Sequence, residues 1–256
     1  MLLGDPQQLP QVTQGTHPDG AGCSVLEHLF EDQDTVEDGA GVLLNETWRL
    51  HPDICEFNSW LSYDEKLHSR DDCLTRAINS TGRLTGAGLR FVPVDHEGCE
   101  QGSPEEAEVI AALCRELLDS GATVQGPIGD SRAFMERALL AEDIKVVAPY
   151  NVAVQMIQQA VPTGVSVGTV DKFQGQEAPV VFYAMTSSTA QDAPRGMAFL
   201  FDDHRLNVAV SRAQCLAVVV ASPRLLDAPA RSLEQLELVN ALCDFVERAA
   251  AVDSGA

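Results

Sequence analysis

The sequence predicts an α/β domain built on a mostly parallel β-sheet with helices on both faces. Four near-continuous apolar runs carry this prediction, at residues 144–150, 165–170, 179–185 and 216–222. Such runs are typical of strands that are buried on both faces of a parallel sheet. Helical stretches lie between several of them, as a layered α/β domain requires.

The remaining elements follow in chain order. The acidic, glycine-ended stretch 27–41 predicts a helix end and a connector. Short apolar strands are predicted at residues 41–46 and 89–94. The last helix is predicted to begin after Ser232 and to cover residues 233–248.

The clearest helix runs from Ser103 to Gly121. Ser103 is a suitable N-cap, Pro104 suits the first helical position, and Glu106 stands where a capping box places its carboxylate. Gly121 is a suitable helix end. One apolar face is predicted for this helix, formed by Ala107, Ile110, Leu113, Cys114 and Leu117.

The composition predicts a folded core. Apolar residues make up 45% of the sequence, which is enough for a folded core. The length of 256 residues is enough for one large or two modest domains. No apolar run approaches the roughly 20 residues of a membrane span, and the apolar start Met1 to Leu3 is too short for a signal peptide. Seven scattered cysteines, without a C-x-x-C spacing, predict reduced thiols in a cytoplasmic protein and no metal site.

The net charge argues against long-range attraction to nucleic acid. It is −21, and only three lysines occur, Lys66, Lys145 and Lys172. An acidic surface repels a phosphate backbone at long range. A nucleic-acid partner would therefore need a local cationic groove or neutral contacts.

Four polar clusters interrupt the apolar pattern: GDPQQLP from Gly4, NETWRLHPDI from Asn45, GTVDKFQGQE from Gly168 and HRLNVAVSRAQ from His204. Each permits an ordinary structural interpretation, respectively a turn, a cation–π pair, a loop and a solvated helix face. In parallel sheets, ligands bind at the carboxyl ends of the strands. The clusters are therefore expected at that edge.

The residues of these clusters, and their order along the chain, resemble the motifs of superfamily 1 helicases, in the branch of the RNA-decay helicases and the replication helicase–nucleases. GDPQQLP is similar to the third motif of that family, TWRLHP to the fourth, VGTVDKFQGQE to the fifth and RLNVAVSRA to the sixth. APYNVAVQ resembles the Pro-Tyr segment after the fourth motif. The likeness runs from Gly4 to about Ser222, and it looks closest to the helicase part of bacterial RecB-like nuclease–helicase fusions.

The resemblance implies RecA-like domains. Residues 1–40 would be a loosely packed remnant of a first RecA-like domain, and residues 41–256 a complete second one with a C-terminal helix. No Gly-Lys dipeptide occurs in the sequence, so the G-x-x-x-x-G-K-[ST] loop that cradles phosphates is absent. The chain is expected to be the C-terminal motor portion of an ATP-dependent helicase: a fragment, a truncated reading frame or one subunit of a split protein.

The resemblance also implies a site for ATP with Mg²⁺ between two RecA-like domains. Arg49 and Arg212 would be the arginine fingers, because a guanidinium is always charged and binds two oxygens. Gln8 would sense the γ-phosphate, Glu177 would contact the ribose, and Gly175 would allow close backbone approach. The phosphate loop and the Mg²⁺ ligands would come from the missing N-terminal portion, which would also carry any nuclease domain.

The implied partner is single-stranded nucleic acid. Pro149, Tyr150, Thr169 and Lys172 would track its backbone through a hydroxyl, a lysine, backbone amides and stacking. Asp5 is expected to support its turn. The family branch implies DNA and 5′-to-3′ movement for bacterial members, whereas the residues themselves leave DNA and RNA open.

Arg49 and Arg212 are expected to point into one cleft. Arg49 follows a predicted strand and would lie at its carboxyl end. Arg205 and Arg212, seven residues apart, would share one face of a helix. Val208 and Val210 would anchor that helix to the sheet.

Two other functions stay open on the sequence. A catalytically inactive relic would bind protein or nucleic acid without ATP hydrolysis. The absent Gly-Lys favours it, whereas the retained Arg49, Gln174, Glu177 and Arg212 favour a site that a partner completes, or a recent truncation. A small-molecule α/β enzyme that uses Asp171 or His204 has no visible nucleophile–base pair in its favour.

Overall fold

The computed structural model describes residues 2–9, 18, 23–30, 35–36, 40–127 and 134–255. Its helices are α1 (Val25–Phe30), α2 (Pro52–Ser62), α3 (Pro104–Asp119), α4 (Asn151–Ala160), α5 (Met197–Leu200), α6 (Asp203–Val210) and α7 (Leu233–Arg248). Its strands are β1 (Glu46–Thr47), β2 (His68–Ser69), β3 (Ala77–Asn79), β4 (Gly88–Pro93), β5 (Thr123–Pro127), β6 (Phe134–Ala138), β7 (Ile144–Val147), β8 (Ser166–Gly168), β9 (Ala178–Ala184), β10 (Ala213–Ala221) and β11 (Ala250–Ala251). Short 3₁₀ helices include η2 (Asp71–Thr75), η3 (Ala141–Asp143), η4 (Val170–Phe173) and η5 (Pro223–Leu225).

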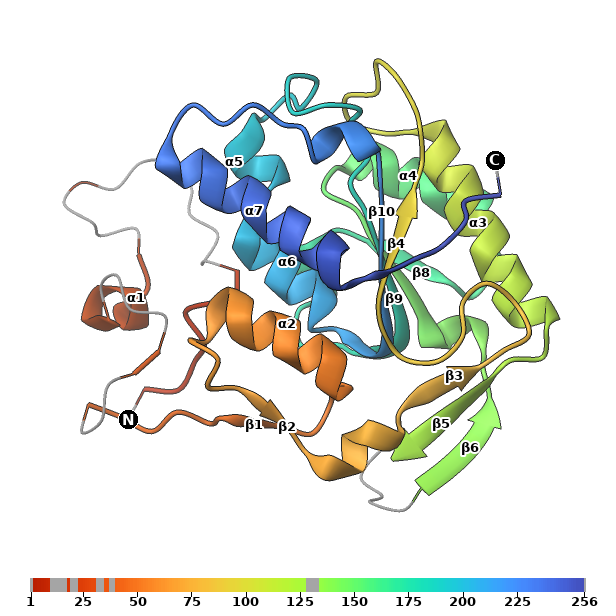
Figure 1. Cartoon of the computed structure of the whole chain (residues 1–256), viewed down its shortest axis with the longest axis horizontal. Coiled ribbons are helices and arrows are strands. Elements are labelled where there is room, and N and C mark those ends of the chain that lie inside the picture. The colour runs from red at the N-terminus through yellow and green to blue at the C-terminus, as the bar shows by residue number, and fades with distance from the viewer. Residues whose placement is uncertain are drawn as a thin grey trace.

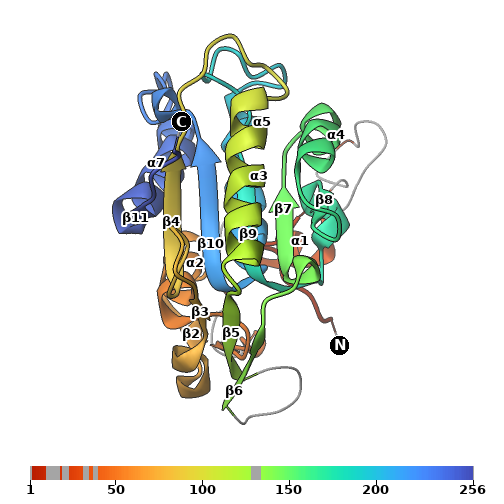
Figure 2. The same ribbon diagram turned by 90° about the vertical axis from the view of Figure 1, so that its right-hand side faces the viewer.

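A six-stranded, all-parallel sheet forms the centre of the fold, in the order β11-β4-β10-β9-β7-β8. Helices α3 and α4 cover one face, and α2, α6 and α7 cover the other (Figure 1). The turned view shows α3 lying along the sheet (Figure 2). The predicted α/β class, with helices on both faces of a parallel sheet, is confirmed. Among the described residues, no helix combines the length and apolar character that crossing a membrane requires.

Alternation along the strands builds the two halves of the core. Every residue of β7 and β9 is buried. Val180 and Phe182 of β9 belong to the cluster beneath α3 and α4, whereas Val181 and Tyr183 belong to the cluster beneath α2, α6 and α7. Successive side chains of a strand point to opposite faces, so a strand covered on both faces is apolar throughout. The predicted apolar runs are therefore strands of this sheet.

The strand predicted at residues 41–46 is wrong. A β-strand forms here only at Glu46–Thr47, which pairs with β2 outside the central sheet. Val42 and Leu44 are 86% and 81% exposed, so this stretch does not lie in the core. The central sheet instead begins with β4 and includes β11 at its edge.

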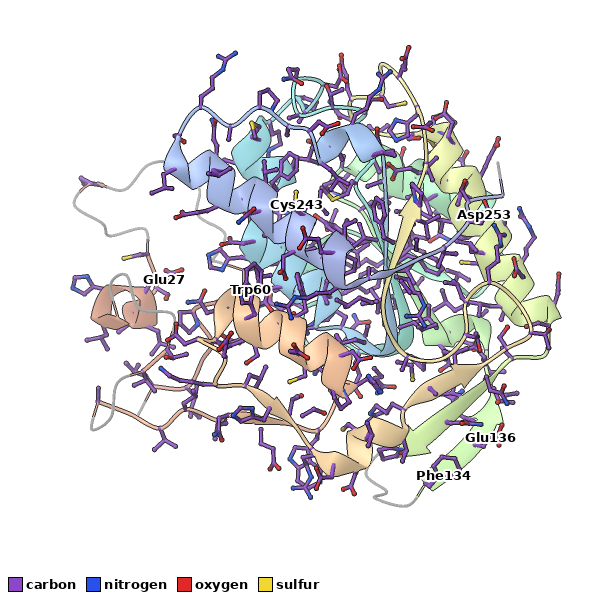
Figure 3. The ribbon with its side chains drawn as sticks, viewed as in Figure 1. Glu27, Trp60, Phe134, Glu136, Cys243 and Asp253 are labelled. Atoms are coloured by element: carbon purple, nitrogen blue, oxygen red, sulfur yellow. The ribbon has the colours of Figure 1, made fainter. Side chains whose placement is uncertain are left out.

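A second, antiparallel sheet in the order β3-β5-β6 was not predicted. Its strands are short and mix polar residues with glycine and proline, so they lack the apolar signal of buried strands. Figure 3 shows Phe134 and Glu136 on β6, at the outer side of this sheet. Glu136 accepts hydrogen bonds across the pair from Thr123 (2.6 Å) and Gln125 (3.2 Å).

The N-terminal segment is bound to the domain at residues 5–9. Asp5 Oδ2 accepts a hydrogen bond of 2.8 Å from the Tyr63 hydroxyl, and the Gln7 carbonyl accepts one of 2.9 Å from Asn207 Nδ2. Leu9 packs against the core. These contacts fix residues that the sequence analysis expected to pack loosely. The predicted helix end after residue 27 is α1, and most of the connector that follows lies outside the described residues.

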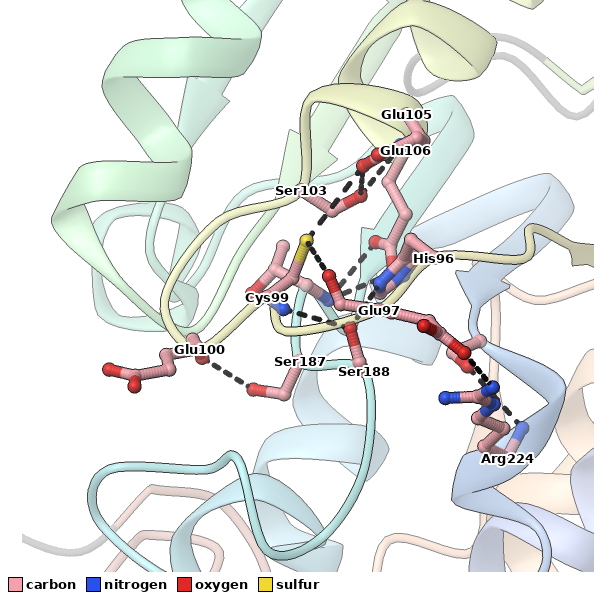
Figure 4. A network of polar contacts seen from close by, with 12 residues as sticks. His96, Glu97, Cys99, Glu100, Ser103, Glu105, Glu106, Ser187, Ser188 and Arg224 are labelled. Atoms are coloured by element: carbon pink, nitrogen blue, oxygen red, sulfur yellow. Dashed lines mark hydrogen bonds and ion pairs between the residues drawn. The ribbon is translucent and has the colours of Figure 1, made fainter.

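The helix α3 begins at Ser103 as predicted, but its capping box is not formed. Ser103 Oγ accepts from the Glu106 backbone N–H at 3.1 Å, as an N-cap should. The Glu106 carboxylate turns inward and accepts from His96 Nε2 at 2.9 Å and from the Thr186 N–H at 3.0 Å (Figure 4). Ser188 Oγ lies 2.8 Å from His96 Nδ1. His96 and the Thr186 N–H are buried donors that need the Glu106 carboxylate as their acceptor. This need outweighs the bond that Glu106 would make to the Ser103 N–H in a capping box.

This network is entirely inside the protein. The side chains of His96 and Glu106 are both 0% exposed. Burial raises the pKa of Glu106, and the hydrogen bond from His96 opposes that rise. Thr186 has φ of +63°, a backbone conformation that non-glycine residues rarely adopt. Its N–H bonds to Glu106 hold it there.

We expect Glu106→Ala to lower the free energy of unfolding by roughly 3 kcal/mol, because it leaves His96 and the Thr186 N–H buried without their acceptor. Denaturant unfolding measures the change. Glu108→Ala is the matched control, since Glu108 is exposed on the same helix; it should stay within about 0.5 kcal/mol of the unaltered protein. Equal stabilities of the two variants would contradict a structural role for the network.

Candidate functional site

The opening turn is organised by Asp5. Its carboxylate accepts from the Gln7 N–H at 3.0 Å and from Gln8 Nε2 at 2.9 Å, and its carbonyl accepts from the Gln8 N–H at 3.3 Å. Such bonds from an aspartate to its own turn are typical of Asx turns. Asp5 supports the turn as predicted, and it holds the amide of Gln8.

Arg49 lies just before α2 and pairs with a residue far along the chain. Its Nε is 2.5 Å from Glu177 Oε2, and its Nη1 donates to the Ser211 carbonyl at 3.1 Å. The two side chains of the ion pair are 30% and 46% exposed. Solvent screens such a pair, so it contributes little to stability, and Arg49 can change partners at low cost.

A β-bulge in β10 brings Gln214 to the same place. The register with β9 shifts by one residue between Ala213 and Leu216. Bulges of this kind re-aim side chains and are frequent next to active sites. Here Gln214 Nε2 donates to Glu177 Oε1 at 2.7 Å, while its carbonyl accepts from the His51 N–H at 3.1 Å. The bulge thus joins the Arg49 segment to the start of β9.

Arg212 is the most unusual cation of the site, because it is buried without a carboxylate. It is 2% exposed. Its N–H groups donate to the carbonyls of Val208 (3.0 Å) and Gln176 (3.5 Å) and to Ser211 Oγ (3.2 Å). A guanidinium has five N–H groups, so two remain without an acceptor among the described residues, and none of the ion pairs found there involves Arg212.

Arg49 and Arg212 are brought together by the fold. Both bond to Ser211. Burial and, to a smaller extent, the charge of Arg49 lower the pKa of Arg212 to about 10, against the opposing effects of Tyr63, Asp5 and Glu177. The guanidinium stays protonated at neutral pH. Glu177 forms an ion pair with Arg49, whereas Arg212 forms none with the described carboxylates.

The site lies at the amino edge of the central sheet, where the sequence analysis expected the carboxyl edge. Glu177 immediately precedes β9 and Arg212 immediately precedes β10. The Ala178 N–H donates to the Arg212 carbonyl at 3.0 Å, which ties the two segments together. The expectation was wrong because the polar segments here lead into the strands and do not follow them.

Arg212 also lies beyond the helix on which it was predicted. The helix α6 ends at Val210, and Ser211 is its C-cap. Arg212 therefore does not share a helical face with Arg205, although its backbone N–H donates to the Ala209 carbonyl at 3.3 Å and its side chain donates to the Val208 carbonyl in the last turn of α6. Val208 and Val210 are buried and anchor the helix as predicted.

Gly175 fits close approach by a ligand. Its φ is +77°, the left-handed region that glycine favours, and a Cβ built on it meets no atom within 4 Å. The side chains of the site fit phosphate, because guanidinium N–H groups match its oxygens in pairs. Within the described ranges, no group of three side chains is suited to hold a metal ion.

The residues predicted to contact nucleic acid lie at the opposite edge. Pro149 and Tyr150 follow β7, and Thr169 follows β8. These strands are neighbours, and the Ala148 N–H donates to the Gly168 carbonyl at 3.1 Å. Pro149 and Thr169 are therefore side by side.

Tyr150 does not present its ring to solvent. It is 6% exposed, and its ring centroid lies 5.4 Å from that of Phe199. Lys172 is exposed and donates to the Val167 carbonyl at 2.7 Å. Lys145, which the sequence analysis did not assign, bonds to Gln176 Oε1 at 3.0 Å.

The segment from Thr169 to Glu177 crosses between the two edges. It starts beside the carboxyl end of β7 and finishes at the amino end of β9. A seven-residue strand such as β9 is about 20 Å long, so the two sets of residues are about that far apart. Phe173 in the middle of this segment is buried in the core.

Sequence reasoning did not assign two residues of the site, Tyr63 and Asn207. The Tyr63 hydroxyl bonds to Asp5, and burial raises the pKa of Tyr63. Asn207 is fully buried and bonds to the Gln7 carbonyl. Asn207 lies inside the RLNVAVSRA cluster, whereas nothing near Tyr63 marks it, because its role depends on a contact 58 residues away.

Comparisons with known proteins find helicases among the relatives of this chain. A protein 29% identical over 248 residues is the DNA replication ATP-dependent helicase/nuclease JHS1 of Arabidopsis thaliana; the match covers 88% of this chain and 17% of JHS1. Two Schizosaccharomyces pombe proteins also match. They are the DNA polymerase alpha-associated DNA helicase A (28% identical, 83% of this chain, 32% of the relative) and helicase sen1 (26%, 87% and 13%). The chain thus spans less than a third of the length of these relatives.

A family described as AAA domain matches residues 22–224, which is most of the chain. That range includes Arg49, Glu177 and Arg212, together with the whole central sheet except β11. The chain therefore belongs to this AAA domain family, the C-terminal type of domain of superfamily 1 helicases.

Proposed function

We propose that the chain is the C-terminal motor portion of an ATP-dependent nucleic-acid helicase. Residues 1–40 are then a remnant of a first RecA-like domain, and residues 41–256 are the second. The phosphate-binding loop and the Mg²⁺ ligands come from an N-terminal RecA-like portion outside this chain, since the sequence contains no Gly-Lys dipeptide.

The observation that carries this proposal is that Arg212 is buried and forms no ion pair with the described residues. A buried cation without a direct ion pair is costly, and an anion that binds at some stage of function would offset this cost. Arg212 is 2% exposed, lies beside a second arginine and has N–H groups to spare. A triphosphate between two domains would supply the missing negative charge.

In this proposal, three side chains exchange their present hydrogen-bond partners for the nucleotide. Arg49 leaves Glu177 for phosphate oxygens, and Glu177 becomes available to the ribose. Gln8 gives up its bond to Asp5 and donates to the γ-phosphate. Bound MgATP supplies the phosphoryl group and its charge, and the two arginines stabilise that charge as it develops in the transition state.

Single-stranded DNA is the proposed partner, held along Pro149, Tyr150, Thr169 and Lys172. The names of two relatives, a DNA replication helicase/nuclease and a DNA helicase, support DNA over RNA. The segment from Thr169 to Glu177 runs from these residues to the arginine site. Movement of the two domains, coupled through this segment, would step the motor along the strand in the 5′-to-3′ direction.

An inactive module that binds nucleic acid or protein is the second candidate. The observation in its favour is the absent Gly-Lys dipeptide. The two proposals differ in what happens when an N-terminal RecA-like portion is supplied. A motor portion regains ATP turnover, and a relic does not.

The chain by itself should release no phosphate from ATP above background, with or without single-stranded DNA, because the P-loop lysine and Mg²⁺ ligands are absent. A steady-state phosphate-release assay measures this. Joining the chain to an N-terminal RecA-like portion should restore DNA-stimulated turnover. Robust turnover by the chain alone would show that a separate nucleotide site exists.

In the joined protein, Arg212→Lys should reduce the rate of ATP hydrolysis by about 10³-fold while DNA binding changes little. Lysine keeps the charge but loses the planar fork that binds two phosphate oxygens. Arg115→Lys is the matched control, since Arg115 is exposed on α3. If Arg212→Lys hydrolyses ATP as fast as the control, Arg212 is not a finger.

A further inference from the structure

A cluster of aromatic and arginine side chains lies at the carboxyl edge of the sheet. Two of its four residues, Arg195 and Phe199, belong to none of the helicase-like motifs. It consists of Tyr150, Arg195, Phe199 and Arg205. The Phe199 ring lies 5.4 Å from the Tyr150 ring. The guanidinium carbons of Arg195 and Arg205 lie over the Phe199 ring, 3.7 and 4.3 Å from its centroid.

The two arginines of the cluster differ in what else they contact. Arg205 is 18% exposed at its side chain and lies 3.6 Å from the Asp202 carboxylate. Arg195 is exposed, and no ion pair to it is found within the described ranges. The exposed Arg115 and Arg231 also have no ion pair within the described ranges, but a cation–π contact is found for Arg195 and for neither of them. In a chain with 38 acidic and 17 basic residues, an exposed arginine without an acidic neighbour is available to an external anion.

Arg195 is also held in place. A guanidinium stacked on an aromatic face is fixed in orientation and keeps its N–H edge directed away from the ring. The loop that carries Arg195 is fastened near its start, because the Ser188 N–H donates to the Cys99 carbonyl at 2.9 Å and Ser187 Oγ donates to the Glu100 carbonyl at 2.7 Å (Figure 4). Less conformational entropy is lost when a prearranged donor binds.

We propose that Arg195, stacked on Phe199 beside Tyr150, binds the phosphate backbone of a single-stranded nucleic acid. This inference rests on the proposed function, because it places Arg195 along the strand that passes Pro149, Tyr150 and Thr169. The buried ring of Tyr150 cannot stack on a base, and its contact with Phe199 connects the segment after β7 to an exposed guanidinium. The cluster provides a local cationic contact on a protein of net charge −21.

Binding of a labelled oligothymidylate by the chain, followed by fluorescence anisotropy over a series of salt concentrations, tests the proposal. Arg195→Gln should weaken binding about tenfold, as loss of a charge-assisted hydrogen bond predicts. It should also reduce the slope of log K against log salt by about 0.7, the value for one phosphate contact to a single strand. Arg195→Lys should fall between, because it keeps the charge and loses the stacked fork.

Arg115→Gln is the matched control, because it removes the same charge from an exposed site on α3; it should leave affinity and slope unchanged. Phe199→Leu keeps an apolar side chain and removes the ring, so it should weaken binding although Arg195 is intact. Thermal unfolding verifies that each variant is folded.

Three results would overturn the proposal. If the Arg195→Gln variant binds as tightly as the Arg115→Gln variant, Arg195 does not contact the nucleic acid, and the proposed function is unaffected. Failure of the unaltered chain to bind oligothymidylate or oligouridylate would overturn the proposed function, and this inference with it. A loss confined to one of the two polymers would place the contact on sugar or base and not on phosphate.

Discussion

The parallel pairing of β9 with β10 is the constraint on which the arginine site depends. Glu177 and Arg212 enter these strands at the same edge, and the bond from the Ala178 N–H to the Arg212 carbonyl aligns them. One extra residue in β10 then turns Gln214 onto Glu177. The Gln214 carbonyl also accepts a hydrogen bond from the His51 N–H. The segment that carries Arg49 is therefore attached to the same two strands. Without that register, residues from three distant parts of the chain would not meet.

The domain places its two sets of functional residues on opposite edges of one sheet. The arginines lie where β9 and β10 begin, and Pro149, Tyr150 and Thr169 lie where β7 and β8 end. Strands buried on both faces are rigid spacers between the edges. The segment from Thr169 to Glu177 is the direct covalent connection between them, and its buried Phe173 fixes it to the core. A change at one edge thus has a packed path to the other.

The distribution of charge explains how an acidic protein can serve an anionic partner. Several cations of the described residues are neutralised locally, as Arg83 is by Glu116 and Arg137 is by Asp143. Among the described arginines that form no ion pair, two lie at the functional edges: Arg212 immediately before β10 and Arg195 on the Phe199 ring. Net charge governs long-range attraction, whereas affinity at contact depends on such local groups.

The sequence by itself determined the α/β class, the strands of the four near-continuous apolar runs, the short strand at residues 89–94, the start of α3 at Ser103 and the helicase family. These features follow from local periodicity, capping chemistry and motif order, which neighbouring residues specify. The sequence could not determine the β3-β5-β6 sheet, whose polar strands are stabilised by cross-strand pairs, nor the edge at which Arg49 and Arg212 meet. It also misplaced the Glu106 carboxylate, because the competing donors, His96 and the Thr186 N–H, come from other parts of the chain. Only the tertiary structure decides such cases, since each depends on which distant groups are buried together and must satisfy one another.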